Sequence, residues 1–106
     1  MPILQINFTF DLPLNEYQDM CRPAAPVIAD VAGLRWKVWL MNEQEREAGG
    51  IYAFETDQAM NDYLGGPIIG KLKTNPAIRD LRIKKFAVLE DVTSVTRGPI
   101  AITAAA

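Results

Sequence analysis

The chain has 106 residues, of which 49% are hydrophobic and 23% charged, and its formal net charge is -2. This length suffices for one ordinary hydrophobic core, so we expect a single domain over residues 1–106. The slightly acidic balance offers no attraction for a polyanion, and nucleic acid is therefore not an expected partner. No segment approaches the length of a membrane span and the N-terminus lacks a leader pattern, so we expect a cytoplasmic protein without membrane contact.

Histidine is absent and cysteine occurs once, as Cys21. A single cysteine excludes an intramolecular disulfide and an all-cysteine metal site. Without histidine the chain has no Ser-His-Asp triad, no Cys-His pair and no His-ligated metal or haem. We therefore predict no metal site, and any catalysis has to rely on other groups.

The N-terminal third predicts a strand followed by a helix. Residues 3–10 alternate, with the apolar positions Leu4, Ile6, Phe8 and Phe10 on one face and Gln5, Asn7 and Thr9 on the other. From Leu14 to Val31 the apolar spacing fits a helix, with Asn15 as its N-cap. Because a proline removes a backbone donor and crowds the preceding turn, Pro23 and Pro26 predict a helix broken into two pieces.

A Trp-bearing β-hairpin is expected from Leu34 to Phe54. Its first strand alternates, and we expect the helices to cover one of the two resulting sets, namely Leu34, Trp36, Val38 and Leu40 rather than Arg35, Lys37, Trp39 and Met41. A polar connection over residues 42–47 and the pair Gly49-Gly50 precede the second strand. Because Trp36 and Trp39 are three positions apart in a strand, they are predicted to point to opposite faces.

The second half predicts a short helix starting at Thr56 and closed by Gly65-Gly66, and a further helical turn over residues 68–73. A fourth strand is expected over residues 78–89, with a β-bulge near Lys84-Lys85 that brings its apolar residues onto one face. The tail over residues 94–106 contains nothing that demands burial. We expect it to extend away or to cover a partner.

The predicted order of elements, strand-helix-strand-strand-helix-strand, is that of the α+β ferredoxin-like fold, with a four-stranded antiparallel sheet and both helices on one face. The second face of such a sheet also carries large apolar groups, such as Trp39 and Met41. A lone sheet would leave these groups in water, and their burial is favourable. We therefore predict a homodimer formed through the open sheet face.

Several aromatic and polar side chains are placed to line a cavity between the sheet and the helices. Asn7, Tyr52 and Tyr63 supply hydrogen-bonding groups that could reach into it, and one of the two tryptophans could line it. The alternative is that these side chains only pack in the core.

Two segments, residues 33–39 and residues 47–54, closely resemble the YdhR family of monooxygenases. The resemblance continues through residues 63–64, 72–73 and 85–88 to Thr96 and Pro99. It implies the dimeric α+β-barrel superfamily, in which two ferredoxin-like subunits join their sheets and each keeps a pocket between sheet and helices. The chain departs from the family pattern where Gly66-Pro67 replaces a Lys-His pair.

The resemblance also implies an activity, because some enzymes of that superfamily are monooxygenases that need neither metal nor flavin. They oxidise anthrone- or quinol-like aromatic molecules with dioxygen. We therefore expect no cofactor, a small aromatic molecule and dioxygen as partners, and two groups of site residues: Asn7, Trp36 and Tyr52 as catalytic residues, and Trp39, Phe54 and Tyr63 in contact with the substrate. The missing histidine argues against the haem-degrading branch, whose usual axial ligand has no counterpart.

A second hypothesis is a non-catalytic dimeric protein that binds an aromatic metabolite or quinone. Without a group that titrates near neutral pH, proton abstraction needs either a carboxylate with a shifted pKa or an acidic substrate. A ligand that is bound and returned unchanged would favour this alternative.

Overall fold

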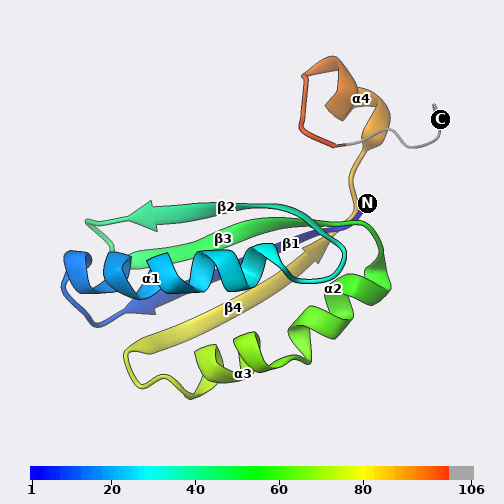
Figure 1. Ribbon diagram of the computed structural model, residues 1–106. Coiled ribbons are helices and arrows are strands. Elements are labelled where there is room, and N and C mark those ends of the chain that lie inside the picture. The colour runs from blue at the N-terminus through cyan, green and yellow to red at the C-terminus, as the bar shows by residue number, and fades with distance from the viewer. Residues whose placement is uncertain (101–106) are drawn as a thin grey trace.

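The computed structural model describes residues 1–100. Its elements, in chain order, are β1 (Ile3–Phe10), α1 (Leu14–Ala29), β2 (Leu34–Asn42), β3 (Glu47–Phe54), α2 (Asp57–Leu64), α3 (Pro67–Thr74), β4 (Ile78–Phe86) and α4 (Glu90–Val95). The antiparallel strands lie in the order β2-β3-β1-β4, and α1, α2 and α3 cover one face of the sheet (Figure 1). The predicted α+β ferredoxin-like fold is confirmed. The predicted tail over residues 94–106 lies partly outside the described residues.

The core lies between the central strand β1 and the three covering helices. As its alternation predicts, β1 turns its larger apolar residues toward the helices, and all are at most 5% exposed: Leu4, Ile6, Phe8 and Phe10. Each helix contributes buried side chains to this layer, namely Tyr17 and Ile28 from α1, Met60 and Tyr63 from α2, and Ile69 from α3. Burial of one such side chain stabilises the fold by about 1.5–3 kcal/mol.

Helix α1 is continuous, so the prediction of two pieces is wrong. Pro23 and Pro26 lie inside one helix of 16 residues. Both prolines are exposed, and so are Asp19 and Arg22 four positions before them, whose carbonyls lose an N–H partner and can bond water instead. Asn15 is not the N-cap, because the helix already begins at Leu14, after Pro13.

Strand β2 contains a bulge at its start that the sequence did not reveal. Leu34 pairs with Phe54, Trp36 pairs with Ala53, and the register shifts between them. Because of the extra residue, Leu34 packs against the core whereas Trp36 lies on the open face. The rest of β2 continues the alternation that starts at Trp36. Val38 and Leu40 therefore lie on the open face, and Lys37, Trp39 and Met41 lie on the helix side. Trp36 and Trp39 do point to opposite faces, as predicted, but each lies on the face that was expected for the other.

A second bulge lies in β4 at Asp80, not near Lys84-Lys85 as predicted. Between Asn7 and Thr9 of β1, β4 contains one residue more than its partner, and Asp80 has a φ of 54°. Beyond this bulge Leu81 and Ile83 pack against the core, while Phe86 lies on the open face and is 46% exposed.

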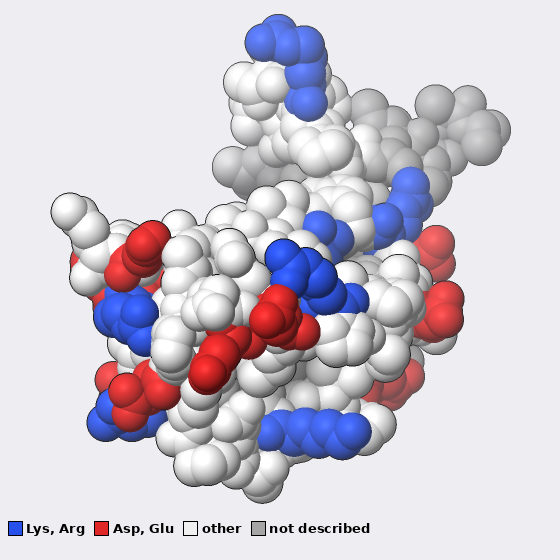
Figure 2. Space-filling model, turned by 60° about the vertical axis from the view of Figure 1, so that its left-hand side comes forward, with Lys and Arg blue, Asp and Glu red and all other residues white. Residues whose placement is uncertain are grey.

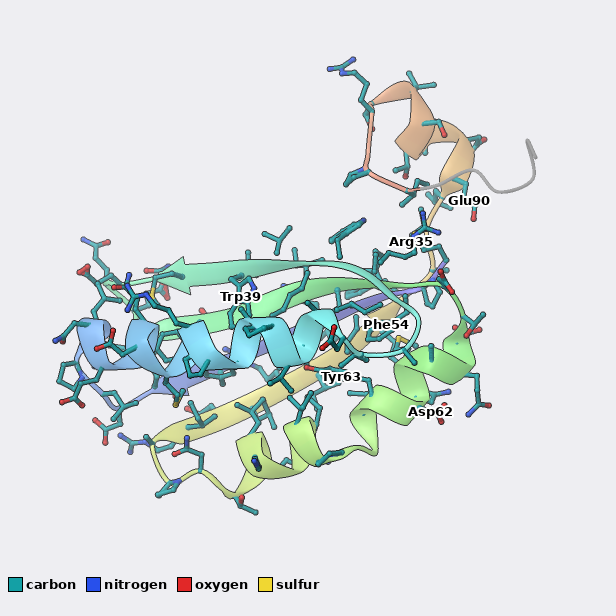
Figure 3. The ribbon with its side chains drawn as sticks, viewed as in Figure 1. Arg35, Trp39, Phe54, Asp62, Tyr63 and Glu90 are labelled. Atoms are coloured by element: carbon teal, nitrogen blue, oxygen red, sulfur yellow. The ribbon has the colours of Figure 1, made fainter. Side chains whose placement is uncertain are left out.

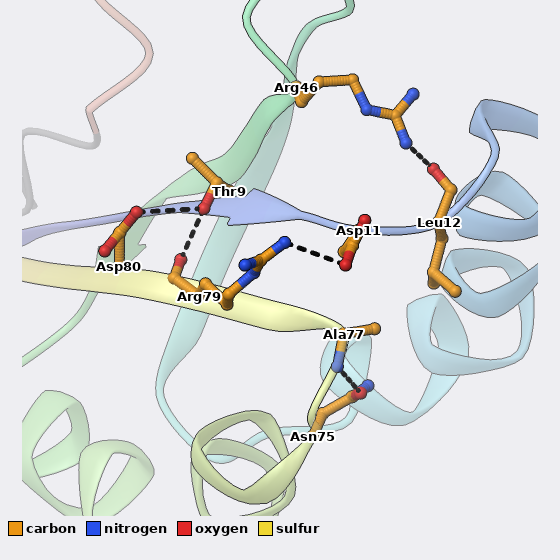
Figure 4. Close-up of polar contacts among 8 residues, drawn as sticks. All are labelled: Thr9, Asp11, Leu12, Arg46, Asn75, Ala77, Arg79 and Asp80. Carbon is orange, nitrogen blue, oxygen red and sulfur yellow. Dashed lines mark hydrogen bonds and ion pairs between the residues drawn. The ribbon is translucent and has the colours of Figure 1, made fainter.

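The polar contacts at this end of the sheet hold the bulged strand against β1 (Figure 4). The Thr9 hydroxyl donates to the Arg79 carbonyl at 3.1 Å and to the Asp80 carboxylate at 3.3 Å. Arg79 also pairs with Asp11 at 2.9 Å. These contacts replace part of the regular ladder that the bulge interrupts.

Helix α4 stands away from the other helices, beyond the end of the sheet (Figure 1). The segment after this helix returns to β2, because the Trp36 indole N–H donates to the Pro99 carbonyl at 2.6 Å. Within the described residues, no helix has both the length and the apolar composition needed to cross a membrane.

Replacement of Pro26 by alanine is expected to raise the free energy of unfolding by on the order of 1–2 kcal/mol, because it restores a backbone donor in an exposed turn of α1. Pro76→Ala is the matched control, since Pro76 is exposed and lies between α3 and β4. At that position the change only increases the conformational entropy of the unfolded chain, so the free energy of unfolding should stay the same or fall slightly. Urea unfolding followed by circular dichroism measures both, and a less stable Pro26→Ala variant would contradict the continuous helix.

Candidate functional site

A cavity of about 440 Å³ lies between the sheet, α1 and α3. Its walls are mainly apolar, and their polar side-chain groups are three tyrosine hydroxyls, two lysine amines, one indole N–H, one thiol and one amide. The lining residues from the sheet and α2 are Phe8, Lys37, Trp39, Gly49, Tyr52 and Tyr63. Those from α1 are Tyr17, Met20, Cys21, Pro23, Ala24, Val27 and Ile28, and those from α3 and the loop after it are Ile68, Ile69, Lys71, Leu72 and Asn75.

Lys37 places an ammonium group inside this cavity. Its Nζ lies 3.4 Å from the centroid of the Trp39 ring and 4.7 Å from that of the Tyr52 ring. Burial lowers the pKa of Lys37 to about 8, against an opposing influence of Cys21. No carboxylate within residues 1–100 forms an ion pair with Lys37. The amine is therefore a cation held against aromatic rings that can lose its proton close to neutral pH.

Two glycines of β3 make room for this arrangement. A Cβ at Gly50 would lie 2.6 Å from Lys37 Cε and 3.3 Å from Tyr52 Cε1, so any side chain there would displace the lysine. At Gly49, where φ is +156°, a Cβ would lie 1.9 Å from the backbone oxygen of Ile6. Gly50 thus leaves space for Lys37, and Gly49 allows β3 to approach β1 closely.

Tyr52 and Tyr63 form a hydroxyl pair at the inner wall. The Tyr63 hydroxyl donates to the Tyr52 oxygen at 3.3 Å, which leaves the Tyr52 hydroxyl hydrogen available to a ligand. Burial raises the pKa of both tyrosines. Burial, followed by a hydrogen bond with Cys21, likewise raises the pKa of Tyr17. All three therefore act as neutral hydroxyl groups at physiological pH.

The structure brings three of the six predicted site residues together at the cavity, namely Trp39, Tyr52 and Tyr63. Trp39 lies near the middle of β2, and Tyr63 lies on α2 beside Phe54 (Figure 3). Phe54 is fully buried and does not line the cavity, but its ring packs 6.2 Å from that of Tyr52 and 5.6 Å from that of Tyr63. Phe54 is thus placed to support the two tyrosines.

Asn7 and Trp36 are not at the cavity, so their predicted place in it is wrong. Asn7 points to the open face, where its side-chain oxygen accepts a hydrogen bond from Gln5 at 2.9 Å. Trp36 lies on the same face because of the bulge at Arg35 and is bonded to Pro99. Both side chains point away from the helices, so neither can reach the cavity.

Lys37 is the site residue that sequence reasoning missed. Plain alternation along the strand groups Lys37 with Trp39 and Met41 on the face away from the helices, and the bulge at Arg35 reverses that face. The spacing between Lys37 and Trp39 could have revealed this position, because residues two apart in a strand share a face. In the structure, Gly50 of the neighbouring strand lies opposite Trp39.

On the face shown in Figure 2, lysine and arginine side chains are interspersed with aspartate and glutamate and form no single patch of one sign. In residues 1–100 no group of three His, Cys, Asp or Glu side chains is placed to hold a metal ion.

The lowered pKa of Lys37 can be measured directly by NMR. We expect one lysine side-chain signal to titrate near pH 8, and this signal to be missing from the spectrum of Lys37→Met, which keeps a chain of similar length. If no lysine signal titrates near pH 8, or if the signal persists in Lys37→Met, the amine is not desolvated as described.

Comparisons with known proteins agree with this fold. The protein NE2512 of Nitrosomonas europaea is 20% identical, with a TM-score of 0.70 over 83% of this chain and 88% of that chain. SnoaB, a cofactor-independent oxygenase from Streptomyces nogalater, is 15% identical, with a TM-score of 0.66 over 84% of this chain and 94% of that chain. The heme-degrader MhuD from Mycobacterium tuberculosis, with two hemes bound, is 19% identical, with a TM-score of 0.55 over 84% and 97%.

A search of curated proteins finds no match. The model of the family described as "Putative mono-oxygenase ydhR" matches residues 3–99, which is nearly the whole of the described chain. The similar solved structures establish the fold, and this match establishes the family. The chain belongs to the YdhR mono-oxygenase family.

Proposed function

We propose that this protein is a monooxygenase that oxidises a hydrophobic aromatic molecule with dioxygen and uses no cofactor. The observation that carries the proposal is the desolvated Lys37 amine in a cavity lined by aromatic rings. Membership of the YdhR family supports the reaction class. The similar fold of SnoaB, a cofactor-independent oxygenase, supports a reaction that needs no cofactor.

The cavity suits a flat apolar ligand. Its volume of about 440 Å³ is within the ordinary range for small-molecule sites, and few polar groups interrupt its walls. The rings of Trp39 and Tyr52 flank the Lys37 ammonium, so an aromatic ligand bound there would place an acidic oxygen or carbon beside the amine. An anthrone- or quinol-like molecule has such a group.

In the first step, neutral Lys37 accepts a proton from the substrate. The C–H or O–H bond breaks, its electron pair stays on the substrate as an enolate or phenolate, and the proton forms the Lys37 ammonium. A lysine with a pKa near 8 is suited to this role, because the efficiency of a general base is greatest near the working pH. The resulting ammonium stabilises the anion, and the apolar walls strengthen this attraction.

In the second step, the substrate anion supplies the electrons that dioxygen needs. One electron passes to dioxygen, the two radicals combine in a C–O bond, and the Lys37 ammonium returns a proton to the peroxide. The O–O bond then breaks together with the remaining C–H bond of the same carbon. Its hydrogen leaves as a proton that joins the departing hydroxide, so water is released and a carbonyl group is left. A CH2 group and one O2 give one C=O group and one H2O, so no external reductant is required.

Tyr52 and Tyr63 assist by donating hydrogen bonds. Because Tyr63 donates to Tyr52, the Tyr52 hydroxyl hydrogen remains for the substrate oxygen. Their raised pKa keeps both hydroxyls protonated while negative charge develops nearby. Trp39 contributes a ring face to the substrate, and Phe54 supports the two tyrosines from behind.

Haem is a weaker fit to this cavity. The sequence contains no histidine, so an iron ligand would have to come from the tyrosines, from Cys21, from Met20 or from a lysine. These tyrosines have raised pKa values, which disfavours the deprotonated form that binds iron.

We also propose that two copies associate through the open sheet face. One half of this face is apolar, with large side chains contributed by three strands: Ile3 from β1, Trp36, Val38 and Leu40 from β2, and Phe86 from β4. Val38 is 49% exposed and Phe86 46% exposed in the single chain. Contiguous apolar groups of this size favour association over contact with water.

Turnover can be tested by oxygen consumption with a panel of anthrones and quinols in the presence of a metal chelator. We expect uptake of one O2 per substrate and a quinone-type product. Lys37→Met should lower kcat/KM about 100-fold or more, because it removes the base and the cation. The rate of the unmodified protein should rise as the pH increases through about 8, where Lys37 loses its proton, and this rise should be missing in Lys37→Met.

Lys73→Met is the matched control for this assay. It removes the same charge from exposed Lys73 of α3, which does not line the cavity, and should leave the rate unchanged. A ligand that binds tightly and is recovered unchanged across the panel would contradict the enzymatic proposal and favour the binding protein. Equal activity of Lys37→Met and Lys73→Met would exclude Lys37 as the base.

Val38→Glu should weaken the proposed dimer, because it places a charge between Trp36 and Leu40 in the apolar half of the open face. Gln18→Glu adds a charge on the exposed side of α1 and should leave the association unchanged. Light scattering at micromolar concentration distinguishes the two. A monomeric unmodified protein would refute the dimer outright.

A further inference from the structure

We propose that the ligand of this cavity carries an acidic group, a carboxylate or sulfonate, and that Lys71 and Asn75 bind it at the mouth between α1 and α3. The inference deepens the proposed function, on which it rests for the identity of the site, because it names the chemical class of the substrate as an aromatic acid.

The first observation is the charge of the cavity walls. Lys37 and Lys71 are the charged residues that line it within residues 1–100, and neither aspartate nor glutamate is among the lining residues. None of the ion pairs formed within these residues includes either lysine. Two uncompensated cations around an apolar space favour an anionic ligand over a neutral one.

The second observation is the orientation of the Asn75 amide. Its oxygen accepts a hydrogen bond from the Ala77 N–H at 2.9 Å, which fixes the plane of the amide (Figure 4). Its nitrogen is thereby directed toward α1, where the acceptor it meets is the Met20 sulfur at 3.7 Å. A thioether is a weak acceptor, so a carboxylate oxygen would be a better partner for this N–H group.

These groups lie on the two helices that border the cavity. Lys71 belongs to the last turn of α3, Asn75 comes directly after that helix, and Met20 belongs to α1. All three line the cavity, and both Lys71 and Met20 are exposed. The anion-binding groups are therefore at the solvent end, while Lys37 remains among the aromatic rings. A ligand with its acid group at the mouth would direct its apolar body inward.

Two fluorescent probes of similar shape test this inference. One is 1-anilinonaphthalene-8-sulfonate, which is an anion, and the other is N-phenyl-1-naphthylamine, which lacks the sulfonate. We expect the unmodified protein to bind the anionic probe more tightly than the neutral one. Lys71→Met and Asn75→Ala should each weaken binding of the anionic probe about threefold to tenfold and leave binding of the neutral probe unchanged.

Lys73→Met is again the matched control, because Lys73 lies on the same helix, is exposed and does not line the cavity. It should bind both probes as the unmodified protein does. Equal effects of Lys71→Met and Lys73→Met would overturn the inference, because attraction would then depend only on total charge. Equal losses for both probes would also overturn it. Retained binding of the neutral probe shows that a variant is folded.

The outcome is separable from that of the oxygen assay. Selective loss of the anionic probe with no turnover of any aromatic substrate would support the acid-binding mouth and contradict the monooxygenase. Turnover of neutral anthrones that is unaffected by Lys71→Met, together with equal binding of the two probes, would support the enzyme and contradict the acid-binding mouth.

Discussion

Gly50 lies opposite Trp39 in the pairing of β2 with β3, and a β-carbon at this position would lie 2.6 Å from Lys37 Cε. Because glycine has no side chain, the lysine stem can cross the face of the sheet and bring its amine between two aromatic rings. The bulge at Arg35 determines which residues of β2 face the helices, and it brings Lys37 and Trp39 to the helix side. The chemistry of the cavity depends on these two backbone features.

A half-buried amine without a carboxylate partner is an unfavourable element in a small fold, because partial desolvation disfavours its charged form. The same desolvation makes Lys37 useful, since it brings the pKa close to neutral pH and strengthens the attraction between the ammonium and an anion. The two tyrosines complete the site with neutral hydroxyl groups. Lys71 and Asn75 extend this preference for an anion to the mouth of the cavity.

Much of the fold could be predicted from sequence, because the alternation of β1 and the spacing of α1 arise directly from side-chain periodicity. The faces of β2 and the end of β4 could not, because each bulge adds one residue and reverses the parity of the strand residues beyond it. Arginine and aspartate also occur at ordinary strand and turn positions, so the residue types of Arg35 and Asp80 do not mark either position as a bulge. The errors at Asn7 and Trp36 concern the faces of the sheet, whereas Trp39, Tyr52 and Tyr63 do line the cavity.

The role proposed for the Lys37 ammonium is to stabilise an anion inside an apolar cavity. The most direct test is the pKa of a bound phenol whose neutral and ionised forms absorb at different wavelengths. Binding to the unmodified protein should lower the pKa of this phenol relative to water, and binding to Lys37→Met should raise it, because only the apolar walls then remain. A phenol whose pKa rises equally in both proteins would contradict the account.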